Sequence, residues 1–263
     1  MNIRAYLNWP GGYSAINREE RNLAAIVYHV LLLKDNLSRF LSLIQCPYEV
    51  DESEMGIFLE YAYLRDLWFQ IEDNGTKKGL ILELLNPVNA QELQEMDISE
   101  FNRHFGAVPK PSKMYIQSPG LWSLPRYNRT VEDDDEFLKV CVFKWAFNAK
   151  PDIVIHTSRD KAVCIEAKLK SVESHYPQAA REKKIYQSRG LKYVRQTSLQ
   201  KYLMEDLLGI ETQFVFLVQK AGQTSDTHGV LLWRDVFKSL DTGGLPGFMR
   251  EMISAISPCA AEA

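Results

Sequence analysis

The chain has 263 residues, of which 46% are hydrophobic, and a formal net charge of −3. This length and apolar content suffice for a large buried core, either as one domain or as a core with an N-terminal extension. The slightly acidic balance gives no global sign of nucleic-acid binding, so any such signal must be local.

The sequence lacks the patterns of a membrane or secreted protein. No cationic segment precedes a hydrophobic stretch, and no apolar run is long enough to span a bilayer. The cysteines lack the spacing of a metal or redox motif, and at least two of them fall in apolar segments; they are Cys46, Cys141, Cys164 and Cys259. We therefore expect a cytoplasmic protein with no membrane partner.

The first predicted element is a long helix that begins near Asn17. Asn17 suits an N-cap, Glu19 and Glu20 lie in the first turn, and apolar residues recur at helical spacing from residue 23 to residue 33. The acids have two interpretations. They compensate the helix dipole, or Glu20, which aligns with Ala24 and Val27, faces the interior.

Between residues 36 and 117 the sequence mixes helical and strand patterns. It predicts helices at residues 36–44, 54–68 and 91–105 and a strand at residues 79–85. Prolines and glycines between residues 106 and 125 mark the best linker. We expect a mainly helical N-terminal region at residues 1–120 and a second domain at residues 121–263.

Five consecutive acids at residues 132–136 precede an apolar helix predicted at residues 137–147. Most of this run is typical of a solvated helix N-terminus, which the helix macrodipole favours. Glu136 is the exception, because it aligns with Val140, Phe143 and Phe147 on the face that packs inward.

A predicted hairpin at residues 151–169 is the centre of the sequence. Two runs rich in Val and Ile, residues 153–155 and 162–165, flank a polar turn, as in a tight hairpin of buried strands. Antiparallel pairing about Arg159 sets Asp152 opposite Glu166 or Ala167, and strand alternation puts Glu166 and Lys168 on one face. Asp152, Glu166 and Lys168 therefore form one group, the acid–lysine cluster.

The acid–lysine cluster suits hydrolysis of a phosphodiester. Two neighbouring carboxylates repel each other, and a hard cation such as Mg²⁺ relieves that repulsion. The cation polarises a phosphoryl oxygen and lowers the pKa of water, while the lysine orients or helps deprotonate the water. The alternative is structural: Asp152 caps a turn, and Glu166 and Lys168 form an ordinary salt bridge. A buried charged trio without a function is costly, which favours the functional interpretation.

These residues resemble the motif of the PD-(D/E)XK nuclease superfamily, with Pro151-Asp152 as its first half and Glu166-Ala167-Lys168 as its second. The resemblance covers about the last half of the chain. It implies an α/β fold with a restriction-endonuclease-like core, which is a mixed central sheet flanked by helices. It also implies that Asp152, Glu166 and the Ala167 carbonyl hold Mg²⁺ or Mn²⁺.

The same resemblance implies further site residues. Members of the superfamily often carry an extra acid on a helix that leads into the sheet, and Glu20 and Glu136 are the candidates here. They also often carry a glutamine on the helix after the second motif strand. Gln196 and Gln200, one turn apart on a helix predicted at residues 191–208, are the candidates for it.

Residues 168–201 contain nine basic residues against two acidic ones, with tyrosines interleaved. A basic segment beside a metal cluster suits a phosphate backbone, and the aromatic rings suit stacking on bases. The candidates for nucleic-acid contact are Lys170, Lys183, Lys184, Arg189, Lys192 and Arg195. A solvated basic face is the alternative, and the position next to the acids favours nucleic acid.

The remaining pattern predicts a buried strand at residues 213–219, an edge strand at residues 230–233 and a helix at residues 248–256. The resembled core normally has one further strand before the strand that follows Asp152. Because residues 132–148 are predicted as a helix, that strand must come from upstream, and residues 79–85 are the candidate.

We therefore expect a Mg²⁺-dependent deoxyribonuclease that serves in defence against foreign DNA or in DNA processing. A nuclease-fold module without turnover that binds nucleic acid or a protein partner is the alternative. RNA as the substrate, assembly into a homo-oligomer and a scaffold role for the N-terminal half stay open.

Overall fold

The computed structural model describes residues 20–107, 112–169, 171–220, 222 and 225–256. The chain divides into two compact units, unit 1 with residues 1–61, 151–172 and 210–263 and unit 2 with residues 62–150 and 173–209. The boundary predicted at residue 120 does not coincide with a boundary of either unit, because each unit joins segments far apart in the sequence. Within the described ranges, no helix is long and apolar enough to cross a membrane.

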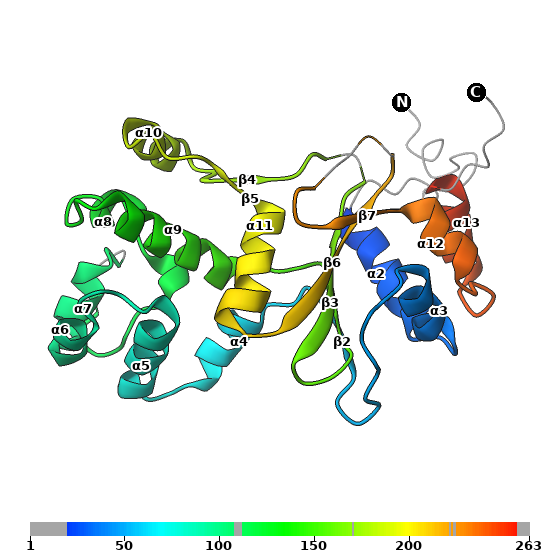
Figure 1. Ribbon diagram of the computed structural model, residues 1–263, viewed down its shortest axis with the longest axis horizontal. Coiled ribbons are helices and arrows are strands. Elements are labelled where there is room, and N and C mark those ends of the chain that lie inside the picture. The colour runs from blue at the N-terminus through cyan, green and yellow to red at the C-terminus, as the bar shows by residue number, and fades with distance from the viewer. Residues whose placement is uncertain (1–19, 108–111, 170, 221, 223–224, 257–263) are drawn as a thin grey trace, which may run out of the picture. The chain divides into compact units, whose positions relative to one another are not determined.

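A mixed five-stranded sheet forms the centre of unit 1, with the strand order β1-β2-β3-β6-β7 (Figure 1). Its strands are β1 (Gly56–Leu59), β2 (Ile153–His156), β3 (Lys161–Ala167), β6 (Glu211–Val218) and β7 (Gly229–Leu232). β2 pairs antiparallel with β1 and β3, whereas β6 runs parallel to β3 and β7 parallel to β6. The predicted mixed α/β architecture is confirmed at this level.

The predicted hairpin is confirmed as β2 and β3. Ile153 pairs with Ile165 and His156 with Ala162, and the Thr157 amide donates to the Lys161 carbonyl at 2.9 Å to close the turn. All residues of β3 except the first are buried. Burial of both faces explains why this strand is continuously apolar until Glu166.

Four of the described helices cover one face of this sheet (Figure 1). They are α2 (Glu20–Leu31), α3 (Asn36–Leu43), α12 (Trp233–Ser239) and α13 (Gly247–Ile256). Because strand side chains alternate, Ile153, Val163 and Ile165 point to this face and pack with helix residues such as Val27 and Trp233. This core fixes the sheet against the helix that carries Glu20.

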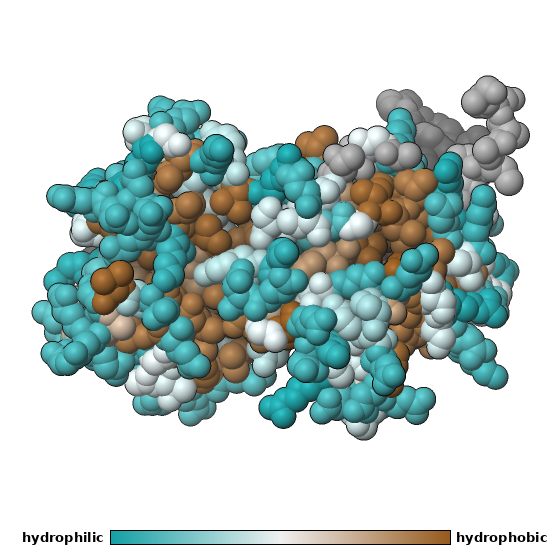
Figure 2. All heavy atoms as spheres, viewed as in Figure 1, coloured by the Kyte–Doolittle hydropathy of each residue, from teal (hydrophilic) through white to brown (hydrophobic). Residues whose placement is uncertain are grey.

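Unit 2 is mainly helical and has its own hydrophobic core around α9 (Asp134–Asn148), where Phe137, Phe143 and Phe147 are buried. Its other helices are α4 (Tyr63–Gln70), α5 (Asn74–Leu85), α6 (Ala90–Glu95), α7 (Ile98–His104), α8 (Leu124–Tyr127), α10 (Ala180–Ser188) and α11 (Gln196–Lys201). It also contains a 3-10 turn η2 (Pro119–Leu121), a π-helical segment η3 (Tyr202–Leu207) and a small sheet of β4 (His175–Tyr176) and β5 (Val194–Arg195). Figure 2 shows hydrophilic side chains over much of one face of the molecule, with apolar side chains visible between them.

Residues 79–85 lie in helix α5, so the strand predicted there is wrong. The Asp73 side chain caps α5 by accepting a hydrogen bond from the Thr76 amide at 2.6 Å. Leucine-rich segments form helices readily once the helix is capped, and only Lys78, Ile81 and Leu85 of α5 are buried.

The additional strand of the sheet is β1, which lies within residues 54–68, where a helix was predicted. Glu60 has a left-handed backbone with φ of 54°, which ends β1 before α4 begins at Tyr63. The helix predicted at residues 91–105 is divided by the Asp97 capping box, and β5 occupies the start of the one predicted at residues 191–208. The elements predicted at residues 36–44, 137–147, 213–219, 230–233 and 248–256 are confirmed within one to three residues at their ends.

The cap of α5 gives a test of this helix. Asp73→Ala should lower the free energy of unfolding, because an amide at the helix start loses its acceptor. Glu83→Ala removes the same charge from an exposed position of α5 and is the matched control. Chemical denaturation of the two variants checks the expectation, and equal effects would contradict the cap.

Candidate functional site

Asp152 and Glu166 lie side by side at one end of the β2–β3 hairpin. Ile153 pairs with Ile165, so continuing the antiparallel register by one residue sets Asp152 opposite Glu166. The Ala167 amide donates a hydrogen bond to Asp152 Oδ2 at 2.8 Å. The hairpin register thus places the two carboxylates as the sequence pattern predicted.

Lys168 completes the acid–lysine cluster. Its Nζ lies 2.6 Å from Glu166 Oε1, and the side chains of Lys168 and Glu166 are 9% and 1% exposed. The Lys168 backbone is fixed at both ends, because its amide donates to the Leu217 carbonyl at 2.8 Å and its carbonyl accepts from Trp233 Nε1 at 2.9 Å. Strand β6 and helix α12 therefore hold the lysine in register.

Glu20, one of the two candidates for the auxiliary acid, contacts the same end of the sheet. Its Oε2 lies 3.8 Å from Lys168 Nζ. Its Oε1 accepts hydrogen bonds from the Leu169 amide at 3.0 Å and from the Ser171 hydroxyl at 2.5 Å. The inward-facing interpretation of Glu20 agrees with these contacts, and helix α2 is joined through it to the segment after β3.

Glu60 is a fourth acid near the cluster that the sequence reasoning missed. Its amide donates to the Asp152 carbonyl at 2.9 Å, and its carboxylate forms an ion pair with Arg21 at 2.9 Å. After burial and the charge of Glu166, the negative charge of Glu60 is the smallest of the causes that raise the pKa of Asp152. Nothing in the sequence indicated Glu60, because residues 54–68 were predicted as one helix and the turn at Glu60 was not recognised.

The electrostatics of the cluster follow from burial. Burial first, and then the negative charge of Glu166, raise the pKa of Asp152 from its ordinary 3.8 to about 7. Burial alone would lower the pKa of Lys168, but the adjacent carboxylates, led by Glu166, raise it instead. Burial opposes ionisation of Glu20, yet its hydrogen bonds from Ser171 and Leu169 and the charge of Lys168 lower its pKa.

The donor chemistry of the cluster fits a hard divalent cation. Asp152 and Glu166 offer carboxylate oxygens, and the Ala167 carbonyl adjoins them. Together with Glu20, the cluster has three carboxyl groups against the one ammonium group of Lys168. Mg²⁺ and Mn²⁺ take such oxygen ligands. Among the described residues, no group of three or more His, Cys, Asp or Glu side chains is arranged to hold a metal. A cation here would thus be held by two carboxylates with backbone and solvent oxygens.

The other predicted site residues belong to unit 2. Glu136 lies in α9 and accepts a hydrogen bond from the Tyr127 hydroxyl at 3.2 Å. Gln196 and Gln200 lie in α11, where Gln200 is buried. All three residues thus lie in segments of unit 2, and their roles in catalysis stay predictions.

The basic residues predicted to contact nucleic acid differ in how accessible they are. Lys183, Lys184 and Lys192 are exposed, and the first two lie on α10. Arg189 is largely buried and donates to Asn128 Oδ1 and to the Val131 and Glu132 carbonyls, as well as pairing with Asp134. Arg195 lies 4.0 Å from Glu173, and Lys170 is outside the described residues. Of the predicted contact residues that the structure describes, these three lysines are thus the exposed ones.

Comparison of the chain with protein-family models, with curated proteins and with solved structures gives no match. The resemblance to the PD-(D/E)XK nuclease superfamily therefore stays a prediction. It rests on the acid–lysine cluster and on the sheet that holds it.

The raised pKa of Asp152 predicts a pH dependence of stability. In the unfolded chain this carboxyl ionises near its ordinary pKa of 3.8, but in the folded protein only near a pKa of about 7. Its contribution to stability is therefore largest below pH 4 and is lost as the pH rises to about 7. The free energy of unfolding of Asp152→Asn minus that of the wild type should rise across this window and then level off. Urea denaturation at several pH values checks this, and a constant difference would contradict it.

Proposed function

We propose that this protein is a metal-dependent nuclease that hydrolyses phosphodiester bonds, most readily in DNA. The observation that carries the proposal is the buried contact of 2.6 Å between Lys168 and Glu166, beside Asp152. A lysine and two carboxylates at one end of a sheet are the groups that metal-assisted phosphodiester hydrolysis needs.

The sheet, in addition to the acid–lysine cluster, supports the resemblance to the superfamily. In the superfamily core, one further strand precedes the strand that follows the first motif acid. Here β2 follows Asp152, and β1 comes earlier in the chain and pairs with β2. The parallel pairing of β6 with β3 and the helices on the sheet agree with a restriction-endonuclease-like core. At residues 132–219, α9 precedes the strands β2 and β3 of the main sheet, and α10 and α11, with the small strands β4 and β5, lie between β3 and β6; this order supports the same assignment.

Asp152, Glu166 and the Ala167 carbonyl would hold Mg²⁺ or Mn²⁺, which when bound polarises a phosphoryl oxygen and acidifies water. The protein prepares this end of the sheet by burying Glu166 and by fixing Asp152 through the Ala167 amide. The raised pKa of Asp152 means that cation binding must compete with a proton near neutral pH.

The environment of Lys168 favours an orienting role over a role as general base. Its neighbouring carboxylates raise its pKa, so the side chain is an ammonium at neutral pH. An ammonium donates hydrogen bonds to the attacking water and to the developing charge on the phosphate, but cannot take a proton. Glu20, within 3.8 Å of Lys168, helps to hold the ammonium in place and is the better supported auxiliary acid.

One observation favours a second candidate function. The ion pair of Glu166 with Lys168 compensates both buried charges within the protein, as it would in a fold that has no turnover. A module that binds nucleic acid through the lysines of α10 without cleaving it agrees with this closed pair.

The chemistry is tested with three variants of the cluster. Asp152→Ala and Glu166→Ala should abolish both cleavage and Mg²⁺ or Mn²⁺ binding, because each removes an anionic oxygen ligand. Lys168→Ala should keep metal binding and lose on the order of 10²-fold or more in turnover, since water loses its partner. Cleavage of plasmid and linear DNA, with calorimetric titration of the metal, measures both effects.

The control is Lys161→Ala, at the opposite end of β3, which should cleave like the wild type. Melting temperatures of all variants separate lost chemistry from lost folding. A folded wild type that binds neither Mg²⁺ nor Mn²⁺ and cleaves no nucleic acid would refute the nuclease and leave the binding module.

The basic segment gives an independent expectation. Reversing the charge of Lys183, Lys184 and Lys192 to Glu should weaken DNA binding and flatten its salt dependence, because fewer counterions are released. Each lost phosphate contact should reduce the slope of log K against log salt concentration by about 0.9. Fluorescence anisotropy at several salt concentrations measures the slope.

The matched control reverses three exposed basic residues of unit 1, namely Lys34, Arg39 and Lys238. It changes the net charge equally, so it should leave the slope near that of the wild type. If both triple variants reduced the slope alike, net charge would explain the effect and the segment would be an ordinary solvated face.

A further inference from the structure

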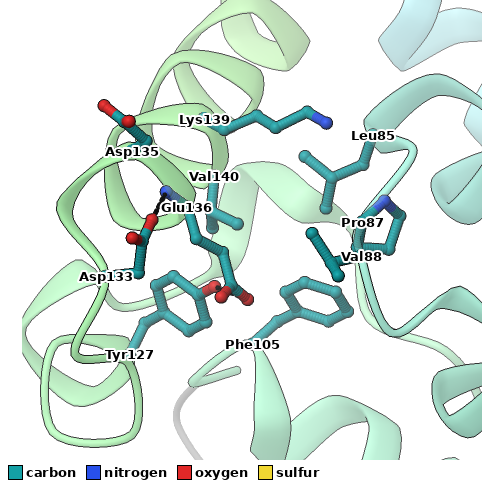
Figure 3. A pocket seen from close by; sticks show the side chains of 10 residues that line it. All are labelled: Leu85, Pro87, Val88, Phe105, Tyr127, Asp133, Asp135, Glu136, Lys139 and Val140. Atoms are coloured by element: carbon teal, nitrogen blue, oxygen red, sulfur yellow. Dashed lines mark hydrogen bonds between the residues drawn. The ribbon is translucent and has the colours of Figure 1, made fainter.

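Unit 2 contains a cavity of about 440 Å³ at the start of helix α9 (Figure 3). The residues that line it come from the end of α5 and the loop after it, from α7 and α8 and their ends, and from the first turns of α9. They are Leu85, Pro87, Val88, Phe105, Tyr127, Asp133, Asp135, Glu136, Lys139 and Val140. This volume lies within the range of sites that bind small molecules.

The cavity combines apolar walls with one carboxylate that enters it. Leu85, Phe105 and Val140 are buried apolar side chains. In Figure 3 the Glu136 side chain extends into the space between the rings of Tyr127 and Phe105. The Tyr127 hydroxyl donates to Glu136 Oε1 at 3.2 Å and so holds the carboxylate in this orientation.

The basic side chains near Glu136 form a hydrogen bond and an ion pair with other residues. Lys139 Nζ donates to the Asn86 carbonyl at 2.7 Å, and its side chain extends away from the carboxylate (Figure 3). Arg189 pairs with Asp134. Burial lowers the pKa of His104 despite the charge of Glu136, so this imidazole is neutral at neutral pH. With Asp133 and Asp135 also at the cavity, three acids line it against one lysine.

We propose that this cavity binds a small organic cation, with an ammonium group on an aromatic or aliphatic body of about ten non-hydrogen atoms. The ammonium pairs with the Glu136 carboxylate, which extends between the rings of Tyr127 and Phe105 (Figure 3). The apolar body packs on Leu85, Val88 and Val140, where it leaves water. A neutral analogue gains only the apolar contacts, and an anion is repelled by the acids.

The inference does not depend on nuclease activity, because every lining residue belongs to unit 2 and binding is measured directly. Phenethylamine, 2-phenylethanol and phenylacetate share one aromatic body and differ in charge. Calorimetry and ligand-observed NMR with the full chain should give saturable binding of phenethylamine, binding of 2-phenylethanol weaker by about tenfold or more, and no binding of phenylacetate.

Glu136→Gln keeps an oxygen that accepts from Tyr127 and removes only the charge, so it should weaken phenethylamine binding by about tenfold or more. Glu132→Gln removes one charge from the same acidic run at an exposed position outside the cavity and should bind like the wild type. Val88→Lys, at a fully exposed residue of the rim, adds a cation without disturbing packing and should also weaken binding.

Three results would overturn the proposal. One is the absence of saturable phenethylamine binding up to about 10 mM. Another is equal affinity for phenethylamine and 2-phenylethanol, and the third is equal loss of affinity in Glu136→Gln and Glu132→Gln. If Glu136→Gln fails to fold, Val88→Lys and the three probes decide the matter.

Discussion

The burial of Glu166, near the end of the central strand β3, is the constraint on which the candidate site of unit 1 depends. A carboxylate that is only 1% exposed is costly unless it is paired and hydrogen-bonded. Lys168 supplies the pair because strand alternation brings it to the same face two residues later. Its ammonium reaches Glu166 only while the Lys168 backbone is held by Leu217 of β6 and Trp233 of α12. The ion pair therefore couples the site to the packing of the sheet and its helices.

The core of the candidate site could be predicted because its geometry is local. Asp152, Glu166 and Lys168 lie within one hairpin, and a two-residue period with one turn fixes which side chains meet. Local spacing along a helix gave the inward direction of Glu20 only as one of two interpretations, beside compensation of the helix dipole. The partners of Glu20, Leu169 and Ser171, are about 150 positions away, and only the folded structure identifies them.

The parts that could not be predicted depend on tertiary contacts or on single backbone angles. Strand β1 is four residues long and is defined by its pairing with β2 rather than by its composition. The left-handed backbone at Glu60 is a tertiary choice for a residue type that does not favour it. Apolar patterns likewise predict that Phe137 and Val163 are buried, but not that they belong to separate cores. The two interleaved units were therefore missed.

The two acidic sites differ in what can neutralise them. At the hairpin, burial and then the negative charge of Glu166 raise the pKa of Asp152, and Lys168 balances only part of the charge. A divalent cation would relieve this excess, with Asp152 and Glu166 as its carboxylate ligands. In unit 2, the Glu136 side chain extends between the rings of Tyr127 and Phe105 and accepts a hydrogen bond from the Tyr127 hydroxyl, and Asp133 and Asp135 also line the cavity (Figure 3). One inward carboxylate among apolar walls would give a hydrated metal ion few oxygen ligands, whereas an organic ammonium would match both the charge and the walls. The number of carboxylates and the polarity of the walls would thus decide which cation each site can hold.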